Sequence, residues 1–353
     1  MSCSFGEKFK ITIFGQSHSE AIGVVIDGVP AGITLDNERI ADFMARRAPG
    51  KTAYSTKRNE SDTPEIISGI VDGVTCGTPI CAIIKNSDQH SKDYSKLRLL
   101  PRPSHSDFPA FLKHNGFNDI RGGGNFSGRM TAPMCFAGAV AMQILEENGI
   151  KIGAHIEKIA GVCDSRFNPV YPELSLLDGK DFPLIDDGAK GKMLQAIEAA
   201  RLDCDSVGGV IECAVTGLPV GAGEPMFDGV ENVMARAMFA IPAIKGIEFG
   251  NGFDCADLKG SENNDEFVVT DGKITTKTNN HGGILGGLTS GMPVIFRVAV
   301  KPTPSISKPQ MTVNLETKTA EELVIGGRHD PCIVPRAVPC VEAATAIAIL
   351  NLI

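Results

Sequence analysis

The sequence predicts an α+β fold in which a layer of helices is covered by β-sheet on both sides. Two segments, 132–147 and 341–353, are apolar almost all round, and a helix without a polar face is buried on all sides. Segments with strand character precede the first of these helices and also lie between the two. The chain has 353 residues, of which 42% are hydrophobic, so it can bury a core of this size.

Four segments carry a clear strand signal: Lys10 to Phe14, Gly23 to Ile26, Gly209 to Val215 and Pro293 to Val300. They are rich in Val and Ile, whose branched side chains suit a pleated sheet. A weak internal echo links two of them, because segments 23–32 and 209–221 each begin as a strand, end in a Pro/Gly turn and precede a helix. The echo predicts pseudo-duplicated halves around one core, and hence a single domain over residues 1–353.

Helices are expected between the strands, and three of them carry end signals. Asp36 can N-cap a helix that places Arg47 on its apolar face. Asp228, with Glu231 three residues later, resembles a capping box at the start of another helix. Asn148-Gly149 is a suitable stop for the helix over 132–147.

The overall charge limits the classes of partner. A formal net charge of -8 and a pI near 5.5 argue against a general nucleic-acid or membrane-surface role, so any anion site must be a local basic pocket. No apolar run reaches the ~18 residues of a membrane span, and no signal-peptide pattern is present at the N-terminus. The sequence therefore predicts a cytoplasmic protein with neither a nucleic acid nor a membrane as partner.

Zinc and redox sites typically have cysteines at CxxC spacing. None of the ten cysteines of this chain has that spacing. Several of them lie inside apolar runs. We therefore expect reduced, buried, structural thiols and no metal site.

Six short segments share glycine turns, hydroxyl side chains and arginines. They are 15–19, 46–50, 102–107, 121–129, 282–305 and 327–336. Glycine turns expose backbone N–H groups, and arginine is a bidentate donor to phosphate or carboxylate. The turn at 122–124 also lies near a helix N-terminus, where anions bind readily, while His18 and His105 can titrate near neutral pH.

Each of these features has an ordinary structural interpretation when it stands alone. A histidine beside serine is often a surface turn, a run of glycines is often a loop, and paired arginines at a helix end often balance the helix dipole. The repeated anion-binding chemistry instead predicts an enzyme that acts on a phosphorylated, carboxylated metabolite. The sequence contains neither a GxxxxGK[ST] P-loop nor a GxGxxG after a strand, which excludes the two common nucleotide-binding fingerprints.

Five of the motifs, in this order along the chain, resemble the chorismate synthase family. They are Gly15-x-Ser17-His18, Arg102-Pro-x-His105-x-Asp107, Gly122-Gly-Gly-x-x-Ser127-x-Arg129, Gly282-Gly-Ile-Leu-Gly-Gly and Gly-Arg328-His329-Asp330-Pro-Cys. The resemblance implies an α+β layered sandwich with central helices between antiparallel β-sheets, assembled as a homotetramer. It also implies a lyase of the shikimate pathway, the route to the aromatic amino acids. The implied reaction is the last step of this pathway, the anti-1,4-elimination of phosphate from 5-enolpyruvylshikimate 3-phosphate to give chorismate, which requires reduced FMN and involves no net redox change.

The resemblance also implies roles for individual residues. His18 would donate a proton to the leaving phosphate, His105 would control protonation of reduced flavin, and Asp330 would accept a proton near flavin N5. Ser17 and Ser127 would take part in this proton traffic, and substrate anions would bind Arg47, Arg129 and Arg336. The implied flavin-binding residues are Asn125, Phe126, Ser127, Pro242, Ala243, Gly286, Lys301, Pro302, Thr303, Pro304, Ser305 and Arg328. The reductant would be NADPH used by the enzyme itself, or a separate flavin reductase would supply reduced flavin.

The chain departs from the family pattern at several positions. Gln16 stands where glutamate is usual, and Ser104 and Ser106 replace the usual glycine and alanine beside the second histidine. Ala53 occupies a position that is often basic, and Pro242 stands where asparagine is frequent. Two rival functions follow from the same motifs: a flavin oxidoreductase with net hydride transfer, and a phosphate-ligand binding protein without chemistry.

Overall fold

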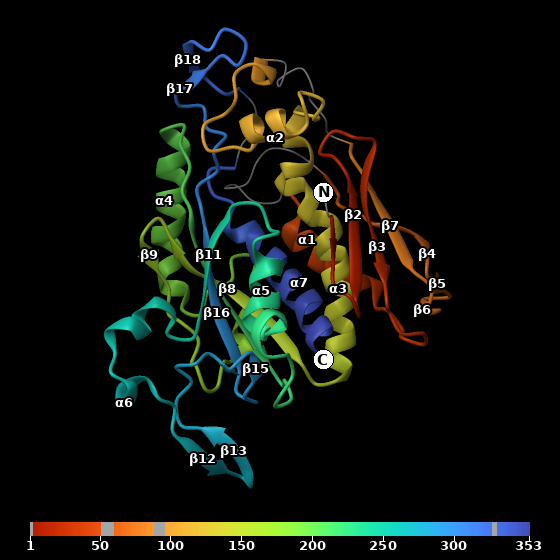
Figure 1. Cartoon of the computed structure of the whole chain (residues 1–353), viewed down its shortest axis with the longest axis vertical. Helices are drawn as coiled ribbons and strands as arrows, with labels where there is room; N and C mark the ends of the chain where they lie inside the picture. Colours follow the sequence, from red (N-terminus) through yellow and green to blue (C-terminus); the bar gives the residue numbers. More distant parts are fainter. Residues whose placement is uncertain (1–2, 51–59, 88–95, 327–329) are drawn as a thin grey trace.

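The computed structural model describes residues 3–50, 60–87, 96–326 and 330–353, so Arg328, His329 and Ala53 lie outside the described residues. Two five-stranded antiparallel sheets enclose a central group of helices (Figure 1). The first sheet has the order β1-β2-β3-β7-β4 and the second the order β11-β16-β10-β8-β9. This is the expected layered sandwich.

The elements of the two sheets and of the central layer have the following bounds. The first sheet contains β1 (Ser4–Phe5), β2 (Lys10–Gly15), β3 (Ala21–Asp27), β7 (Ile80–Lys85) and β4 (Glu65–Ser68). The second contains β11 (Ile244–Phe249), β16 (Val294–Val300), β10 (Gly209–Thr216), β8 (Lys151–Ile159) and β9 (Val162–Cys163). The helices between them are α1 (Asn37–Arg47), α3 (Thr131–Glu147), α5 (Val230–Met238) and α7 (Val334–Leu352).

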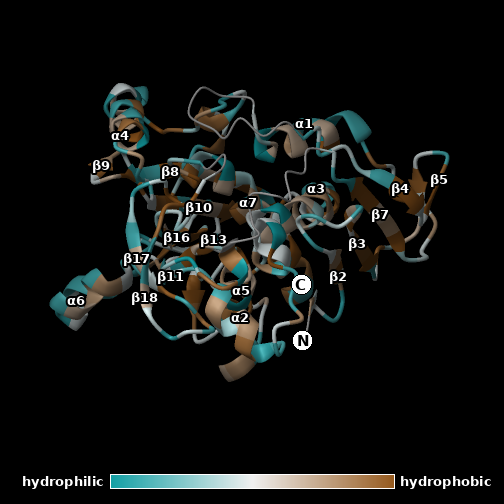
Figure 2. Ribbon diagram, turned by 90° about the horizontal axis from the view of Figure 1, so that it is seen from above, coloured by the Kyte–Doolittle hydropathy of each residue, from teal (hydrophilic) through white to brown (hydrophobic). Residues whose placement is uncertain are grey.

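Smaller elements lie at the periphery. Helix α4 (Lys190–Leu202) lies outside the second sheet (Figures 1 and 2). The remaining helices are α2 (Asp107–Lys113) and α6 (Gly260–Asn263), and the short strand pairs are β5 (Ile70–Val71) with β6 (Val74–Thr75), β12 (Phe267–Thr270) with β13 (Lys273–Thr276), β14 (Ile284–Leu285) with β15 (Leu288–Thr289), and β17 (Gln310–Val313) with β18 (Ala320–Leu323). In Figure 2 the strands of the two main sheets are mostly hydrophobic, whereas many peripheral turns are hydrophilic.

The two all-apolar helices are in contact along the centre of the molecule. Helix α3 packs against β2, β3 and β7, whereas α7 packs against β8 and β10. Their crossing is close, because a Cβ added at Gly138 would lie 2.3 Å from the Cβ of Ala343. Glycine and alanine therefore bring the two helices together, and one hydrophobic core joins both sheets.

Most of the local predictions are confirmed. All four strands form, and Asp36 caps α1 by accepting hydrogen bonds from the backbone N–H groups of Glu38 (3.0 Å) and Arg39 (3.1 Å). Asn148 caps the C-terminus of α3 as expected. The two echo segments contain β3 and β10, each the central strand of its sheet.

Three local predictions are wrong. The capping box is absent, because α5 begins at Val230 after Gly229 and Asp228 lies in the preceding 3-10 turn. Helix α7 begins at Val334, seven residues earlier than predicted, because Pro335 is compatible with a first helical turn. All ten cysteines are free thiols, but five are exposed rather than buried, since they lie in loops, at a strand end or in a short 3-10 helix: Cys3, Cys76, Cys163, Cys204 and Cys255.

None of the helices in the described part of the chain is both long and apolar enough to cross a membrane. Within the same residues, no group of three or more His, Cys, Asp or Glu side chains is placed to hold a metal ion.

Candidate active site

A cavity of about 550 Å³ lies where α1 ends and where α3 and α7 begin. It brings together most of the predicted site residues, although they come from distant parts of the sequence. The predicted residues that line it are Arg47, His105, Asn125, Phe126, Ser127, Arg129, Pro242, Ala243, Lys301, Thr303, Pro304, Ser305, Asp330 and Arg336.

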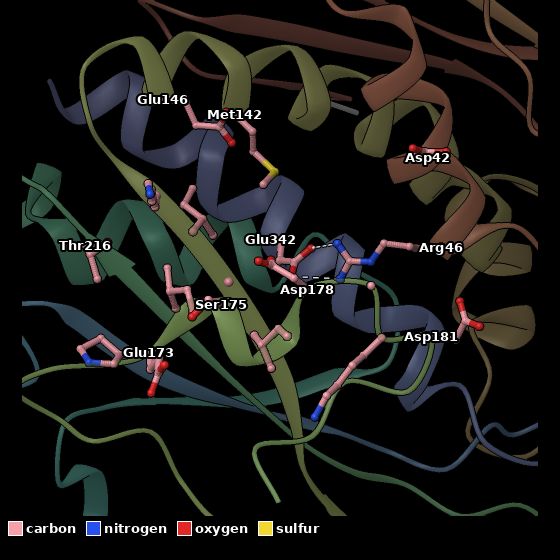
Figure 3. Close-up of a pocket in the computed structure, with 18 of the residues that line it drawn as sticks. Asp42, Arg46, Met142, Glu146, Glu173, Ser175, Asp178, Asp181, Thr216 and Glu342 are labelled. Atoms are coloured by element: carbon pink, nitrogen blue, oxygen red, sulfur yellow. Dashed lines mark hydrogen bonds and ion pairs between the residues drawn. The ribbon is translucent and has the colours of Figure 1, made fainter. Parts of the chain in front are cut away.

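The lining of this cavity is strongly basic. Among the described residues that line it, five carry a cationic side chain (Arg47, Arg102, Arg129, Lys301 and Arg336) and only Asp330 carries a carboxylate. A second cavity, of about 1040 Å³, lies beside β8 (Figure 3) and has the opposite balance. Its acidic residues are Asp42, Glu146, Glu173, Asp178, Asp181 and Glu342, against Arg46, Lys151 and Lys180. The smaller, basic cavity is therefore the better site for an anionic ligand.

Two of the arginines are held by one buried carboxylate. Arg47 and Arg129 both donate hydrogen bonds from Nη1 to Asp62, and all three residues are almost fully buried. Burial raises the pKa of the Asp62 carboxyl, but the charges of Arg47 and Arg129 outweigh this and hold that pKa below its usual value. Asp62 was not predicted as a site residue.

The third arginine is paired with the predicted proton acceptor. Arg336 Nη1 donates to Asp330 Oδ2 at 2.6 Å, and Arg336 Nε donates to the carbonyl oxygen of Arg47 at 3.1 Å. Asp330 precedes α7 and Arg336 lies in its first turns, so the start of this helix positions both groups. Asp330 is also fixed through its backbone, because Thr303 Oγ1 donates to its carbonyl oxygen at 2.9 Å.

His105 belongs to a hydrogen-bonded network with Arg102 and Asp107. Arg102 donates to both oxygens of Asp107, from Nε at 2.7 Å and from Nη2 at 2.8 Å, and donates from Nη1 to Ser305 Oγ at 3.0 Å. His105 Nδ1 lies 2.7 Å from Asp107 Oδ1. Arg102 Nη2 also lies 3.1 Å from this nitrogen, but the shorter contact is with a carboxylate, which only accepts, so Nδ1 carries the proton and Nε2 is left as the acceptor.

Burial also determines the charge of this histidine. Burial lowers the pKa of His105, the bond to Asp107 raises it, and the charges of Arg102 and Lys301 lower it again, with a net lowering. The imidazole is therefore neutral at pH 7, with the lone pair of Nε2 available to accept a proton.

His18 and Ser17 do not line the cavity but lie directly behind it. A Cβ added at Gly122, which does line the cavity, would lie 2.3 Å from His18 Nδ1 and 2.6 Å from Ser17 Oγ. Gly122, Gly123 and Gly124 all have positive φ, of 60°, 82° and 53°. The glycine turn therefore leaves room for the imidazole beside the cavity wall. Ser127 has a structural role as well, since its Oγ accepts from Arg129 N at 3.2 Å.

The residues present fit a flavin nucleotide. Phe126 and Phe239 line the cavity and are 39% and 54% exposed, so they offer flat apolar faces to an aromatic ring. Ser104, Thr303 and Lys301 supply polar donors, as a phosphorylated chain requires. Lys301 is held there by donating from Nζ to the carbonyl oxygen of Ser104 at 2.6 Å.

Two predicted cofactor residues do not line this cavity. Gly286 lies in the β14–β15 turn, and Pro302 packs close to Gly208. The departure at Pro242 does line it, next to Ala243, whose φ is 76°. Several residues that line or support the cavity were not predicted as site residues. Of these, Arg102 and Asp107 belong to the motif around His105. Phe239, Cys340 and Asp62 carried no signal in the sequence.

Comparison with known proteins gives matches over nearly the whole chain. The family model for chorismate synthase matches residues 9–353. A protein of Dehalococcoides mccartyi named chorismate synthase is 47% identical over 353 residues, covering 100% of this chain and 96% of that protein. The chorismate synthase of Korarchaeum cryptofilum is 45% identical, covering 98% and 96%. A solved structure described as "Crystal Structure of Chorismate Synthase" superposes with a TM-score of 0.74 at 28% identity, covering 98% of this chain and 92% of that one.

Proposed function

This chain belongs to the chorismate synthase family, and from that premise we propose that its basic cavity is where phosphate is eliminated from 5-enolpyruvylshikimate 3-phosphate. Family membership makes the protein a lyase of the shikimate pathway with chorismate as product. The observation that carries the assignment to this cavity is its lining, with five cationic side chains and one carboxylate. The substrate, with one phosphate and two carboxylates, has the complementary charge.

In this proposal the guanidinium groups bind the anions and stabilise the leaving group. Arg47, Arg129 and Arg336 are held by buried or half-buried partners, so they need little rearrangement when negative charge develops on the departing phosphate. Donors that are already oriented in a site shielded from water contribute most to the transition state.

In this proposal the proton carriers come from different elements of the chain. His18, behind Gly122, would donate a proton to the leaving phosphate, and Ser17 lies beside it. His105 would exchange a proton at Nε2 with the pyrimidine edge of the flavin, since its Nδ1 is committed to Asp107. Asp330, fixed by Arg336, would accept a proton near flavin N5, and Ser127 also lines the cavity.

The cofactor in this proposal is reduced FMN, held by Phe126, the 242–243 turn, Lys301 and residues 303–305. The chemistry that it supplies when bound is transient electron donation as the C–O bond to phosphate breaks, with no net oxidation. Reduction of the flavin has two alternative sources, NADPH bound by this chain or a separate reductase. Anaerobic incubation with NADPH and FMN alone distinguishes them, because only the first bleaches the flavin without a second protein.

We also propose a single domain that assembles as a homotetramer in the cytoplasm. One hydrophobic core joins the two sheets, which supports the single domain. Large apolar side chains stay exposed in the isolated chain, among them Phe117 at 92% and Phe253 at 84%, which supports subunit contacts. The ten free thiols suit a reducing compartment. Analytical ultracentrifugation of the purified protein tests the assembly.

The experiment that tests the function is an anaerobic assay with reduced FMN and the substrate. We expect phosphate and chorismate in equal amounts, with many turnovers for each reduced flavin. Oxidation of one flavin for each product would favour the oxidoreductase alternative instead. Binding without any phosphate release would favour the binding protein.

A further inference from the structure

A buried carboxylate behind the cavity links two arginines from different elements. Asp62 precedes β4, Arg47 ends α1, and Arg129 lies in the 3-10 turn that leads into α3. The carboxylate is fully buried and accepts one hydrogen bond from each guanidinium, with Oδ2 bonded to Arg47 and Oδ1 to Arg129. It does not line the cavity, whereas both arginines do.

Each guanidinium is fixed in three directions. Arg47 also donates from Nε to Thr131 Oγ1 at 3.1 Å and from Nη2 to the carbonyl oxygen of Gly128 at 3.3 Å. Asp62 completes this set, and it is the partner that Arg47 and Arg129 have in common.

The second guanidinium has an equivalent set of partners. Arg129 donates from Nε to Asn86 Oδ1 at 2.9 Å and from Nη2 to the carbonyl oxygen of Lys85 at 3.4 Å, and its Nη2 lies 3.7 Å from Glu60 Oε2. Two buried cations that face the same cavity repel each other unless an anion lies between them. Asp62 occupies that position.

We propose that Asp62 is a positioning residue that sets the separation and orientation of Arg47 and Arg129, and so shapes the site for the anionic groups of the substrate. The inference rests on the proposed function of the cavity. Asp62 would act through the two guanidinium groups and not touch the substrate itself. Its loss should therefore weaken substrate binding more than it slows the chemical step.

The chain offers a matched control in the neighbouring residue of α1. Arg46 Nη1 donates to Glu342 Oε2 at 2.7 Å and its Nη2 donates to Oε1 at 3.1 Å, and Glu342 is only 3% exposed (Figure 3). This is also a pair of an α1 arginine with a buried carboxylate, but it borders the other, acidic cavity. Glu342→Gln should destabilise the fold in a similar way without changing the basic cavity.

The test measures KM, kcat and melting temperature for Asp62→Asn, Asp62→Glu and Glu342→Gln. We expect Asp62→Asn to raise KM for 5-enolpyruvylshikimate 3-phosphate about 10- to 100-fold, with a smaller change in kcat. Asp62→Glu keeps the charge and should recover part of this loss. Glu342→Gln should lower the melting temperature but leave KM within about two-fold of the wild type, as for a residue outside the site.

Several results would overturn the proposal. An unchanged KM in Asp62→Asn would mean that Asp62 only balances charge, and a lowered KM would mean that it competes with the substrate. An equal rise of KM in Glu342→Gln would show that weakening α1 is sufficient. If Asp62→Asn does not fold, the KM of Asp62→Glu provides the test. The one added methylene should still shift both guanidinium groups and raise KM, and an unchanged KM would overturn the proposal. A wild-type protein that releases no phosphate would instead refute the function of the cavity.

Discussion

Replacing Gly122 by alanine tests whether the glycine turn exists to accommodate His18. Gly122 has φ 60° and ψ 17°, a left-handed conformation in which a Cβ costs about 1 to 2 kcal/mol. That Cβ would lie 2.3 Å from His18 Nδ1, whereas non-bonded heavy atoms settle at about 3.5 Å. The imidazole, the turn, or both must therefore move by about 1 Å.

A displacement of this size has a large kinetic effect at a reacting centre. We expect Gly122→Ala to lower kcat by about 100-fold, the scale associated with a misplacement of about 1 Å. Folding should survive with a melting temperature a few degrees lower. The assay is anaerobic phosphate release at saturating substrate and reduced FMN, with circular dichroism as the check on folding.

Gly128→Ala is the matched control for this substitution. Gly128 also lines the cavity, but a Cβ there meets no atom within 4 Å and its φ is not positive. We expect its kcat to stay within about two-fold of the wild type, as for a side chain added in open space. If folded Gly122→Ala shows the same near-normal kcat, the proton-donor role of His18 is refuted.

Three further predictions concern other parts of the molecule. Asp330→Asn should keep FMN bound in the presence of substrate while lowering turnover about 10²- to 10⁴-fold, the scale for a lost general base; weakened flavin binding with normal turnover at saturating FMN would contradict the proton-acceptor role. Burial lowers the pKa of His155, but the bonds of its ring to Asp164 and Glu212 outweigh burial and leave that pKa raised. Protonation of His155 therefore stabilises the fold below about pH 6.5, and this stabilisation is lost as the pH rises through the pKa of the folded protein. The difference in melting temperature between wild type and His155→Gln should therefore narrow from pH 6 to pH 9. A difference that widens would show that the pKa of His155 is lowered, not raised, in the folded protein. The thiol of Cys135 donates to Cys340 at 3.8 Å and, against the effect of burial, lowers the pKa of Cys340, which lines the cavity. Alkylation of Cys340 by iodoacetamide, followed on its own peptide by mass spectrometry because five other thiols are exposed, should show an apparent pKa below about 8.5, and Cys340→Val should keep its activity.

The parts of the fold that were predictable have local causes. Asp36 caps α1 and Asn148 ends α3 through bonds within a few residues of each, so the sequence alone shows both. The predicted start of α7 at residue 341 followed the apolar run alone, whereas the helix extends back to Val334, with Pro335 in a first turn that tolerates it and Pro339 inside the helix.

The site residues likewise fall into those with a local signal in the sequence and those without one. The motifs around His105 and Asp330 could be found because their residues are close in sequence. The linking role of Asp62 could not be found, because its partners lie 15 and 67 residues away in other elements. The pairing of Asp330 with Arg336 was also missed, since it depends on where α7 begins. The existence of a second, larger cavity with the opposite charge is a property of the packed structure that no local pattern shows.

The central claim is that the basic cavity, and not the larger acidic one, binds the substrate together with the flavin. A crystal structure with oxidised FMN and 5-enolpyruvylshikimate 3-phosphate tests it most directly. We predict density for the substrate against Arg47, Arg129 and Arg336, with the flavin ring beside Phe126 and within reach of Asp330. Density for either molecule in the cavity beside β8, with the basic cavity empty at saturating concentrations, would contradict the account.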